Sequence, residues 1–99
     1  MNPETKVQRE IMKYLRDKKI LVWRISDNTN MAGFPDLLVC YKGRFVALEV
    51  KVDAQYSKPT LQQEKVINDI NTIGHGVARV VKSVEDVERI LNEAPFVQY

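Results

Sequence analysis

The sequence predicts an α/β fold in which a mixed central sheet is flanked by helices, in the order αβββαβ(α). Apolar residues recur at helical spacing in two segments, 3–17 and 60–73. Between them, two runs rich in Leu, Val and Phe surround Lys42-Gly43, which is typical of a β-hairpin. A β-branched run over 77–81 follows the second helix. A hairpin followed by a helical crossover to a further strand gives a mixed sheet with helices on its faces.

The first helix begins at Asn2-Pro3, where Asn is a good N-cap and Pro suits the first helical position. A strand is expected over 20–25, followed by a polar loop over 26–33. Beyond the hairpin we expect a loop over 54–59, and Gly74 ends the helix that follows it. Ser83 caps a last helix that reaches about residue 92.

Composition bounds the kind of protein. Its 99 residues are 44 % hydrophobic and 28 % charged, which predicts one globular domain spanning 1–99. The lone Cys40 excludes an intrachain disulfide and is expected to be a small core residue. No apolar stretch approaches the length of a membrane span, so we expect no membrane partner and a cytoplasmic protein. The net charge of +2 is small, but basic residues crowd the first quarter of the chain.

The hairpin brings two acidic residues together. A two-residue loop at Lys42-Gly43 pairs Tyr41 with Arg44, and counting outward places Asp36 opposite Glu49. Like charges at directly opposed positions destabilise a sheet. Lys51 points to the same face as Glu49, because strand side chains repeat every second position. Two carboxylates beside a lysine, in an otherwise apolar hairpin, favour a hard divalent cation such as Mg²⁺.

The pattern resembles the PD-(D/E)XK nuclease signature and, within it, the VRR-NUC (virus-type replication-repair nuclease) family. The resemblance covers roughly residues 4–90. It rests on Glu4 and Gln8 in the first helix, then Arg24, Gly33-Phe34-Pro35-Asp36, Glu49-Val50-Lys51, and a helix that opens Thr60-Leu61-Gln62-Gln63 and ends near Gly74. It implies a PD-(D/E)XK restriction-endonuclease-like fold.

The resemblance also assigns roles. Asp36 and Glu49 would bind Mg²⁺ or Mn²⁺ together with the backbone carbonyl of Val50, and an acidic residue of the first helix would complete the metal shell. Glu4 is the best match for that residue and Glu10 is its competitor, although a first-turn Glu is also what the helix dipole favours. Lys51 would help a water attack the scissile phosphate.

Gln63 admits two interpretations. In the family it would be an active-site residue, whereas Thr60-x-x-Gln63 also fits a capping box. Arg24, Asn28, Asn30 and Lys58 are candidate nucleic-acid contacts. His75, the only histidine, lacks Cys or His partners for zinc.

The function that follows is a metal-dependent DNA endonuclease. The family implies a homodimer acting on branched DNA such as a Holliday junction, in the replication and repair of a bacterium or a phage-infected cell. A two-fold dimer suits a two-fold symmetric junction, and the ending 95–99 offers apolar groups to an interface or to its own domain. Two alternatives stay open: a DNA-binding module without catalysis, and a nuclease of the same fold acting on RNA.

Overall fold

The computed structural model describes residues 2–25, 32–52 and 58–93. Along these residues the elements are α1 (Pro3–Asp17), β1 (Leu21–Arg24), β2 (Leu37–Tyr41), β3 (Arg44–Val50), α2 (Leu61–Thr72), β4 (Val77–Val81) and α3 (Val84–Asn92). The predicted order of elements is therefore confirmed, including the last helix. The predicted loops over 26–33 and 54–59 lie mostly outside the described residues, and the ending 95–99 lies entirely outside them.

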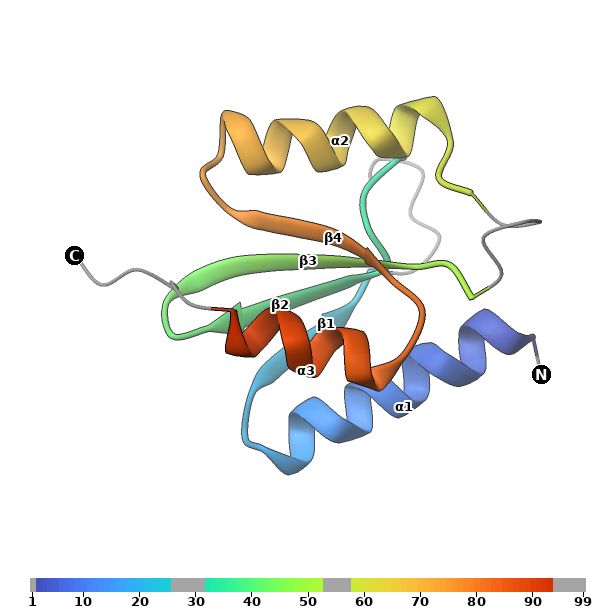
Figure 1. The fold of residues 1–99 in the computed structure, drawn as a ribbon, viewed down its shortest axis with the longest axis vertical. Helices are drawn as coiled ribbons and strands as arrows, with labels where there is room; N and C mark the ends of the chain where they lie inside the picture. Colours follow the sequence, from blue (N-terminus) through green and yellow to red (C-terminus); the bar gives the residue numbers. More distant parts are fainter. Residues whose placement is uncertain (1, 26–31, 53–57, 94–99) are drawn as a thin grey trace.

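The four strands form one mixed sheet in the order β1-β2-β3-β4. The β1–β2 and β2–β3 pairs are antiparallel, and the helical crossover through α2 makes β3 and β4 parallel. Helices α1 and α3 lie on one face of the sheet and α2 lies on the other (Figure 1). None of the described helices is long and apolar enough to cross a membrane.

Local chemistry sets the ends of the elements. The Asn2 side chain accepts hydrogen bonds from the Glu4 and Thr5 amides and so caps α1. The predicted strand over 20–25 is shorter, Leu21–Arg24, because the Ile20 amide still donates to the Leu15 carbonyl at the end of α1.

The hairpin turn has the predicted register. Tyr41 pairs with Arg44, and both Lys42 (φ 52°) and Gly43 (φ 77°) adopt the left-handed conformation that a two-residue hairpin turn requires. The register is thereby fixed along the whole of β2 and β3.

The apolar core lies between the sheet and the α1–α3 layer. Its fully buried members include Ile11 and Leu15 of α1, Leu48 of β3 and Val87 of α3. One prediction is wrong here: Cys40 is exposed. Strand alternation points Val39 into the core and therefore turns Cys40 to the opposite face, beside Phe45, which is itself 43 % exposed.

Candidate active site

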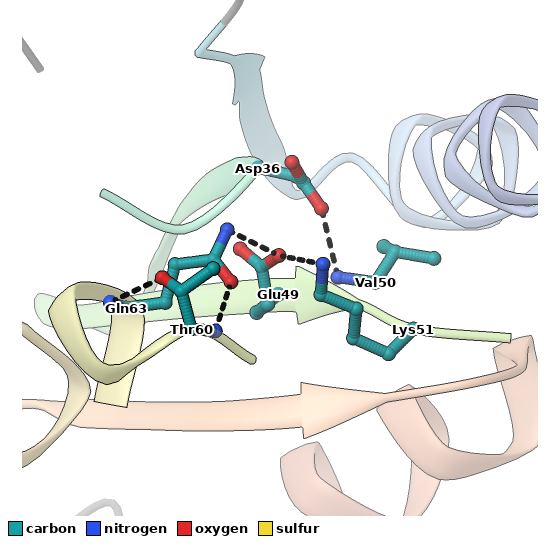
Figure 2. Close-up of polar contacts among 6 residues, drawn as sticks. All are labelled: Asp36, Glu49, Val50, Lys51, Thr60 and Gln63. Atoms are coloured by element: carbon teal, nitrogen blue, oxygen red, sulfur yellow. Dashed lines mark hydrogen bonds and ion pairs between the residues drawn. The ribbon is translucent and has the colours of Figure 1, made fainter. Parts of the chain in front are cut away.

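The candidate site lies at the end of the sheet where β2 begins and β3 ends. The β2–β3 ladder reaches Leu37 opposite Leu48, so Asp36 and Glu49 take the next position of the same register. The carbonyl of Asp36 accepts a hydrogen bond from the Ile25 amide (2.8 Å), which ties the residue to the end of β1. Its carboxylate accepts a second from the Val50 amide (2.9 Å; Figure 2). The fold thus brings together the two carboxylates that the hairpin register predicts.

Glu49 is the most buried acidic group of the site. Only 1 % of the residue is exposed, although β3 surrounds it with apolar neighbours. Its Oε2 atom accepts a hydrogen bond from Gln63 Nε2 (3.1 Å) and lies 3.4 Å from Lys51 Nζ (Figure 2). Within the described part of the chain, its Oε1 atom is buried and has no hydrogen-bond partner. A buried carboxylate oxygen without a partner is costly, and a cation would satisfy it.

Both carboxyl groups are costly to ionise in this site. Burial, and after it the neighbouring Asp36, raises the pKa of Glu49 to about 7, against the opposing effect of Lys51. Burial also raises the pKa of Asp36, and the Val50 amide and Lys51 offset this in part. Perturbed carboxyl groups of this kind gather at functional sites.

Lys51 follows β3 directly, and its amide donates to the Val81 carbonyl of the neighbouring strand (2.9 Å). Its side chain is only 16 % exposed and points to Glu49. The salt bridge to Glu49 is therefore present, and the same geometry puts a positive charge at the edge of the carboxylate pair.

Gln63 caps helix α2 and also contacts Glu49, while its active-site role stays a prediction. Its Oε1 accepts from the Thr60 amide (2.9 Å) and its own amide donates to Thr60 Oγ1 (3.1 Å), so the capping box is confirmed. Its Nε2 remains available and donates to Glu49. The first turn of α2 is thus attached to the candidate site through one side chain (Figure 2).

A cavity of about 250 Å³ opens on the α1 side of Asp36, and Glu4, Gln8 and Arg24 are among its lining residues. Glu4 is half-buried there, whereas Glu10 is exposed and does not line the cavity. Across the described residues, no three His, Cys, Asp or Glu side chains gather closely enough to hold a metal ion. Glu4 therefore lies near the carboxylate pair, and its part as a further metal ligand stays a prediction.

Gln8 belongs to the family resemblance, but the sequence analysis gave it no role in the site. It is 9 % exposed, it lines the same cavity as Asp36 and its side chain lowers the pKa of that carboxyl, and its Oε1 atom is buried without a partner in the described residues. The signal was available: Gln8 shares the buried helix face of Ile11 and Leu15, where a polar side chain is out of place.

The remaining candidates are dispersed. Arg24 is exposed and reaches the Asp36 cavity, while Lys58 is exposed and lines a different cavity together with Lys51. Asn28 and Asn30 lie outside the described residues. His75 is exposed in a turn with φ 53°.

The donor set fits a divalent cation. Two acidic side chains, one with an unsatisfied buried oxygen, supply the hard oxygen ligands that Mg²⁺ and Mn²⁺ prefer. Asp36 and Glu49 are the residues that would hold such an ion. The part of the Val50 carbonyl stays a prediction.

Comparison with known proteins places this fold. No family model matches the sequence, and no curated protein matches it. A solved structure described as "VRR_NUC domain" is 26 % identical and superposes with a TM-score of 0.77, over 96 % of this chain and 100 % of the other. A second, "VRR_NUC domain protein", is 21 % identical with a TM-score of 0.71, over 94 % and 88 %, and supports the fold alone.

The four-stranded mixed sheet with helices on both faces is therefore that of a nuclease of the PD-(D/E)XK type. The resemblance to the VRR-NUC domain predicted from the sequence is confirmed over nearly the whole chain. Such a domain implies a phosphodiester hydrolase with a nucleic-acid substrate.

Proposed function

We propose that the protein is a Mg²⁺- or Mn²⁺-dependent DNA endonuclease, folded as one domain over residues 1–99, with Asp36, Glu49, Lys51 and Gln63 in its active site. The observation that carries the proposal is the buried Glu49 carboxylate. One of its oxygens is held by Gln63 and Lys51, and the other has no partner in the described residues. This polarised arrangement lies beside a second carboxylate, in the fold of a nuclease domain.

Each residue has a distinct task in the proposed reaction. Asp36 and Glu49 bind the cation, and Gln63 holds Glu49 so that its Oε1 is available as a ligand. When bound, the ion activates a water and neutralises charge on the phosphate. Lys51 adds a fixed positive charge where negative charge develops in the transition state.

Arg24 and Lys58 flank the site as candidate phosphate contacts, with Asn28 and Asn30 proposed for the same task. Base readout needs an extended surface in a groove of DNA. A domain of 99 residues leaves little surface for that, which favours recognition of DNA shape. Branched DNA such as a four-way junction is the proposed substrate.

A homodimer is the proposed assembly, and an apolar row on the sheet supports it. Leu21, Cys40 and Phe45 are cross-strand neighbours on the face opposite the core, and all three are exposed. Trp23, 49 % exposed, lies on the same face of β1. Contiguous exposed apolar side chains of this kind mark association surfaces. Trp23→Ser should lower the molecular mass measured by sedimentation from that of a dimer to that of a monomer.

The test is cleavage of a labelled four-way junction, linear duplex, single-stranded DNA and RNA, with Mg²⁺, Mn²⁺ or EDTA. Glu49→Gln keeps the shape of the side chain and should reduce cleavage at least about 100-fold. Glu88→Gln, an exposed charge on α3, is the matched control and should cut like the wild type. Metal-dependent cutting of the junction alone supports the whole proposal.

Other outcomes separate the alternatives. Equal cutting of every DNA form keeps the nuclease and removes the preference for junctions, and cutting of RNA alone replaces the substrate. Binding without cutting in either metal leaves a DNA-binding module.

A further inference from the structure

Two basic cavities lie on either side of the candidate site. The first, of about 440 Å³, is formed between α1 and the end of β1 by Arg9, Met12, Lys13, Arg16, Asp17 and Arg24; we call it the α1 groove. It presents four cationic side chains and one carboxylate, and that carboxylate is already paired with Lys13 (2.8 Å). Its charge is therefore strongly positive.

The second cavity, of about 230 Å³, lies at the other edge of the sheet; we call it the lysine pocket. Lys51, Lys58 and Lys82 surround a floor that includes Val80 and Val81 of β4. Asp86, its one acidic lining residue, accepts a hydrogen bond from the Lys82 backbone amide and forms an ion pair with Arg89. Asp86 is thus already paired with Arg89, and this one carboxylate cannot neutralise three lysine side chains.

The lysine pocket lies at the end of the sheet that carries the carboxylate pair, and the α1 groove reaches that end at Arg24. The register aligns Arg24 with Leu37, Leu37 with Leu48, and Leu48 with Arg79, so one row of residues joins the ends of β1 and β2 to β3 near its end and to the middle of β4. The carboxylates end the two central strands, and the cavities flank the two edge strands.

Shared residues connect the three sites. Arg24 lines both the α1 groove and the cavity that contains Asp36. Lys51 pairs with Glu49 and also lines the lysine pocket. Cationic residues therefore lie on both sides of the carboxylate pair, and Arg24 and Lys51 connect the two cavities to it.

The dimensions suit an extended polyanion. Neighbouring strands lie about 4.8 Å apart, so three spacings take the row across about 14 Å. The α1 groove continues for about 10 Å along the helix between Arg9 and Arg16. Phosphates of one DNA strand advance about 3.4 Å per nucleotide along the duplex axis, so several phosphates fit along this path.

We propose that one strand of a DNA substrate crosses the end of the sheet from the α1 groove to the lysine pocket, so that phosphates on both sides of the scissile bond are held by cationic side chains. The inference rests on the proposed nuclease function and adds to it the path of the substrate. Arg9 and Arg16 bind the strand on one side of the cut, and Lys82 binds it on the other.

The test compares charge-removing variants in EDTA, where binding is separated from cleavage. Binding of a fluorescent four-way junction is measured against salt concentration for Arg9→Gln/Arg16→Gln, for Lys82→Gln and for the wild type. The slope of log Kobs against log salt should fall by about one for each phosphate contact removed, hence by about two and about one. Circular dichroism checks that each variant is folded.

Lys42→Gln/Lys65→Gln is the matched double control. Lys42 lies in the hairpin turn, at the end of the sheet opposite the carboxylate pair. Lys65 lies on α2 and forms an exposed ion pair with Asp69, comparable to the Lys13–Asp17 pair of the α1 groove. This variant loses the same charge and should keep the wild-type slope. Equal slopes in the groove variants and this control would overturn the proposed path.

A second arm uses cleavage in Mn²⁺ with substrates shortened on one side of the cut. The defect of the α1-groove variant should vanish with one truncation and that of Lys82→Gln with the other. If the same truncation removed both defects, the two cavities would bind DNA on the same side of the scissile bond, and the proposed path across the sheet would be wrong. If the salt slopes fall as expected but the protein cuts no DNA, the proposed nuclease function is wrong and the two DNA-binding surfaces remain supported.

Discussion

The face of the sheet under α1 and α3 is covered by apolar side chains, whereas the face under α2 is covered sparsely and through polar contacts. Helix α1 buries Ile11 and Leu15, and α3 buries Val87, Ile90 and Leu91. Helix α2 has no buried residue, and its Leu61 is 85 % exposed. Hydrogen bonds help attach α2 to the sheet: Gln63 bonds to Glu49 of β3, and Asn71 bonds to the Ala78 backbone of β4.

The two faces of the sheet therefore differ in what they contribute: the α1–α3 face contributes mainly stability, and the α2 face carries the candidate site. The face that buries mostly apolar groups contributes most of the hydrophobic free energy of folding. The opposite face carries Glu49, an ionisable group that a closely packed apolar layer would exclude. The α2 layer brings the polar side chain of Gln63 to Glu49 at the cost of weaker apolar packing, as is common where activity and stability compete.

Leucine truncation on the two faces should give the largest contrast. Leu15→Ala empties a fully buried position and is expected to lower the free energy of unfolding by about 2–5 kcal/mol. Leu61→Ala, on α2, should change it by less than about 0.5 kcal/mol because the side chain is exposed. Urea unfolding without metal measures both. Similar losses in the two variants would mean that α2 is packed more tightly than the exposed fractions indicate.

The next largest change in the free energy of unfolding is expected where α2 is attached to β4. Asn71 donates to the Ala78 carbonyl (3.0 Å) and accepts from the Ala78 amide (2.8 Å), so it satisfies the free edge of β4 at a residue that is 1 % exposed. Asn71→Ala leaves the buried Ala78 amide without its partner, while the Ala78 carbonyl keeps a hydrogen bond from Arg79 Nη1 (3.0 Å), and should cost about 1–3 kcal/mol. It should also speed hydrogen exchange of the Ala78 amide.

Asn68→Ala, on the exposed side of the same helix, is the control for that prediction and should leave both stability and exchange almost unchanged. Equal behaviour of the two variants would show that the edge of β4 needs no partner from α2.

The carboxylate pair should make stability depend on pH in the opposite sense to an ordinary salt-bridged acid. Glu49 stays protonated in the folded protein up to a pKa of about 7, whereas the unfolded chain ionises it near 4.5. The folded state therefore binds more protons between these values, and the contribution of Glu49 to stability falls as pH rises through that window. After allowance for solvent screening, the fall should be about 1–2 kcal/mol.

Glu49→Gln isolates this contribution from those of the other carboxyl groups. Urea unfolding of the metal-free wild type and of the variant at pH 5 and pH 8 should show the variant gaining relative to the wild type at the higher pH. Added Mg²⁺ or Mn²⁺ should stabilise the wild type at pH 8 and affect the variant less. Parallel pH curves for the two proteins would contradict the assigned origin of the effect.

Much of the fold and part of the site were predictable because they depend on local chemistry. The Lys42-Gly43 turn fixes a register, and the register alone brings Asp36 beside Glu49. The capping box is likewise local, since Thr60 and Gln63 belong to one helical turn. Periodicity was enough to place the strands and helices in order.

Contacts between elements distant in the sequence were not predictable in this way. That Gln8 would meet Asp36 depends on how α1 packs against the sheet end, and that Gln63 would reach Glu49 while capping α2 depends on the crossover. The exposure of Cys40 follows from the limited cover of α2, which no local pattern encodes. The catalytic roles of the gathered residues stay predictions.

Gln63 both caps α2 and donates a hydrogen bond to Glu49. Variants that separate these two contacts should give the smallest difference between the two faces. Thr60→Ala removes only the cap of α2 and should cost about 1 kcal/mol of stability while leaving cleavage near the wild-type rate. Gln63→Glu preserves an acceptor for the Thr60 amide but cannot donate to Glu49, and it adds a like charge beside it. Stability should then change little compared with cleavage, which should fall at least about tenfold. If Thr60→Ala instead lost as much cleavage as Gln63→Glu, the position of the α2 terminus, and not the Gln63 amide, would be what orients Glu49.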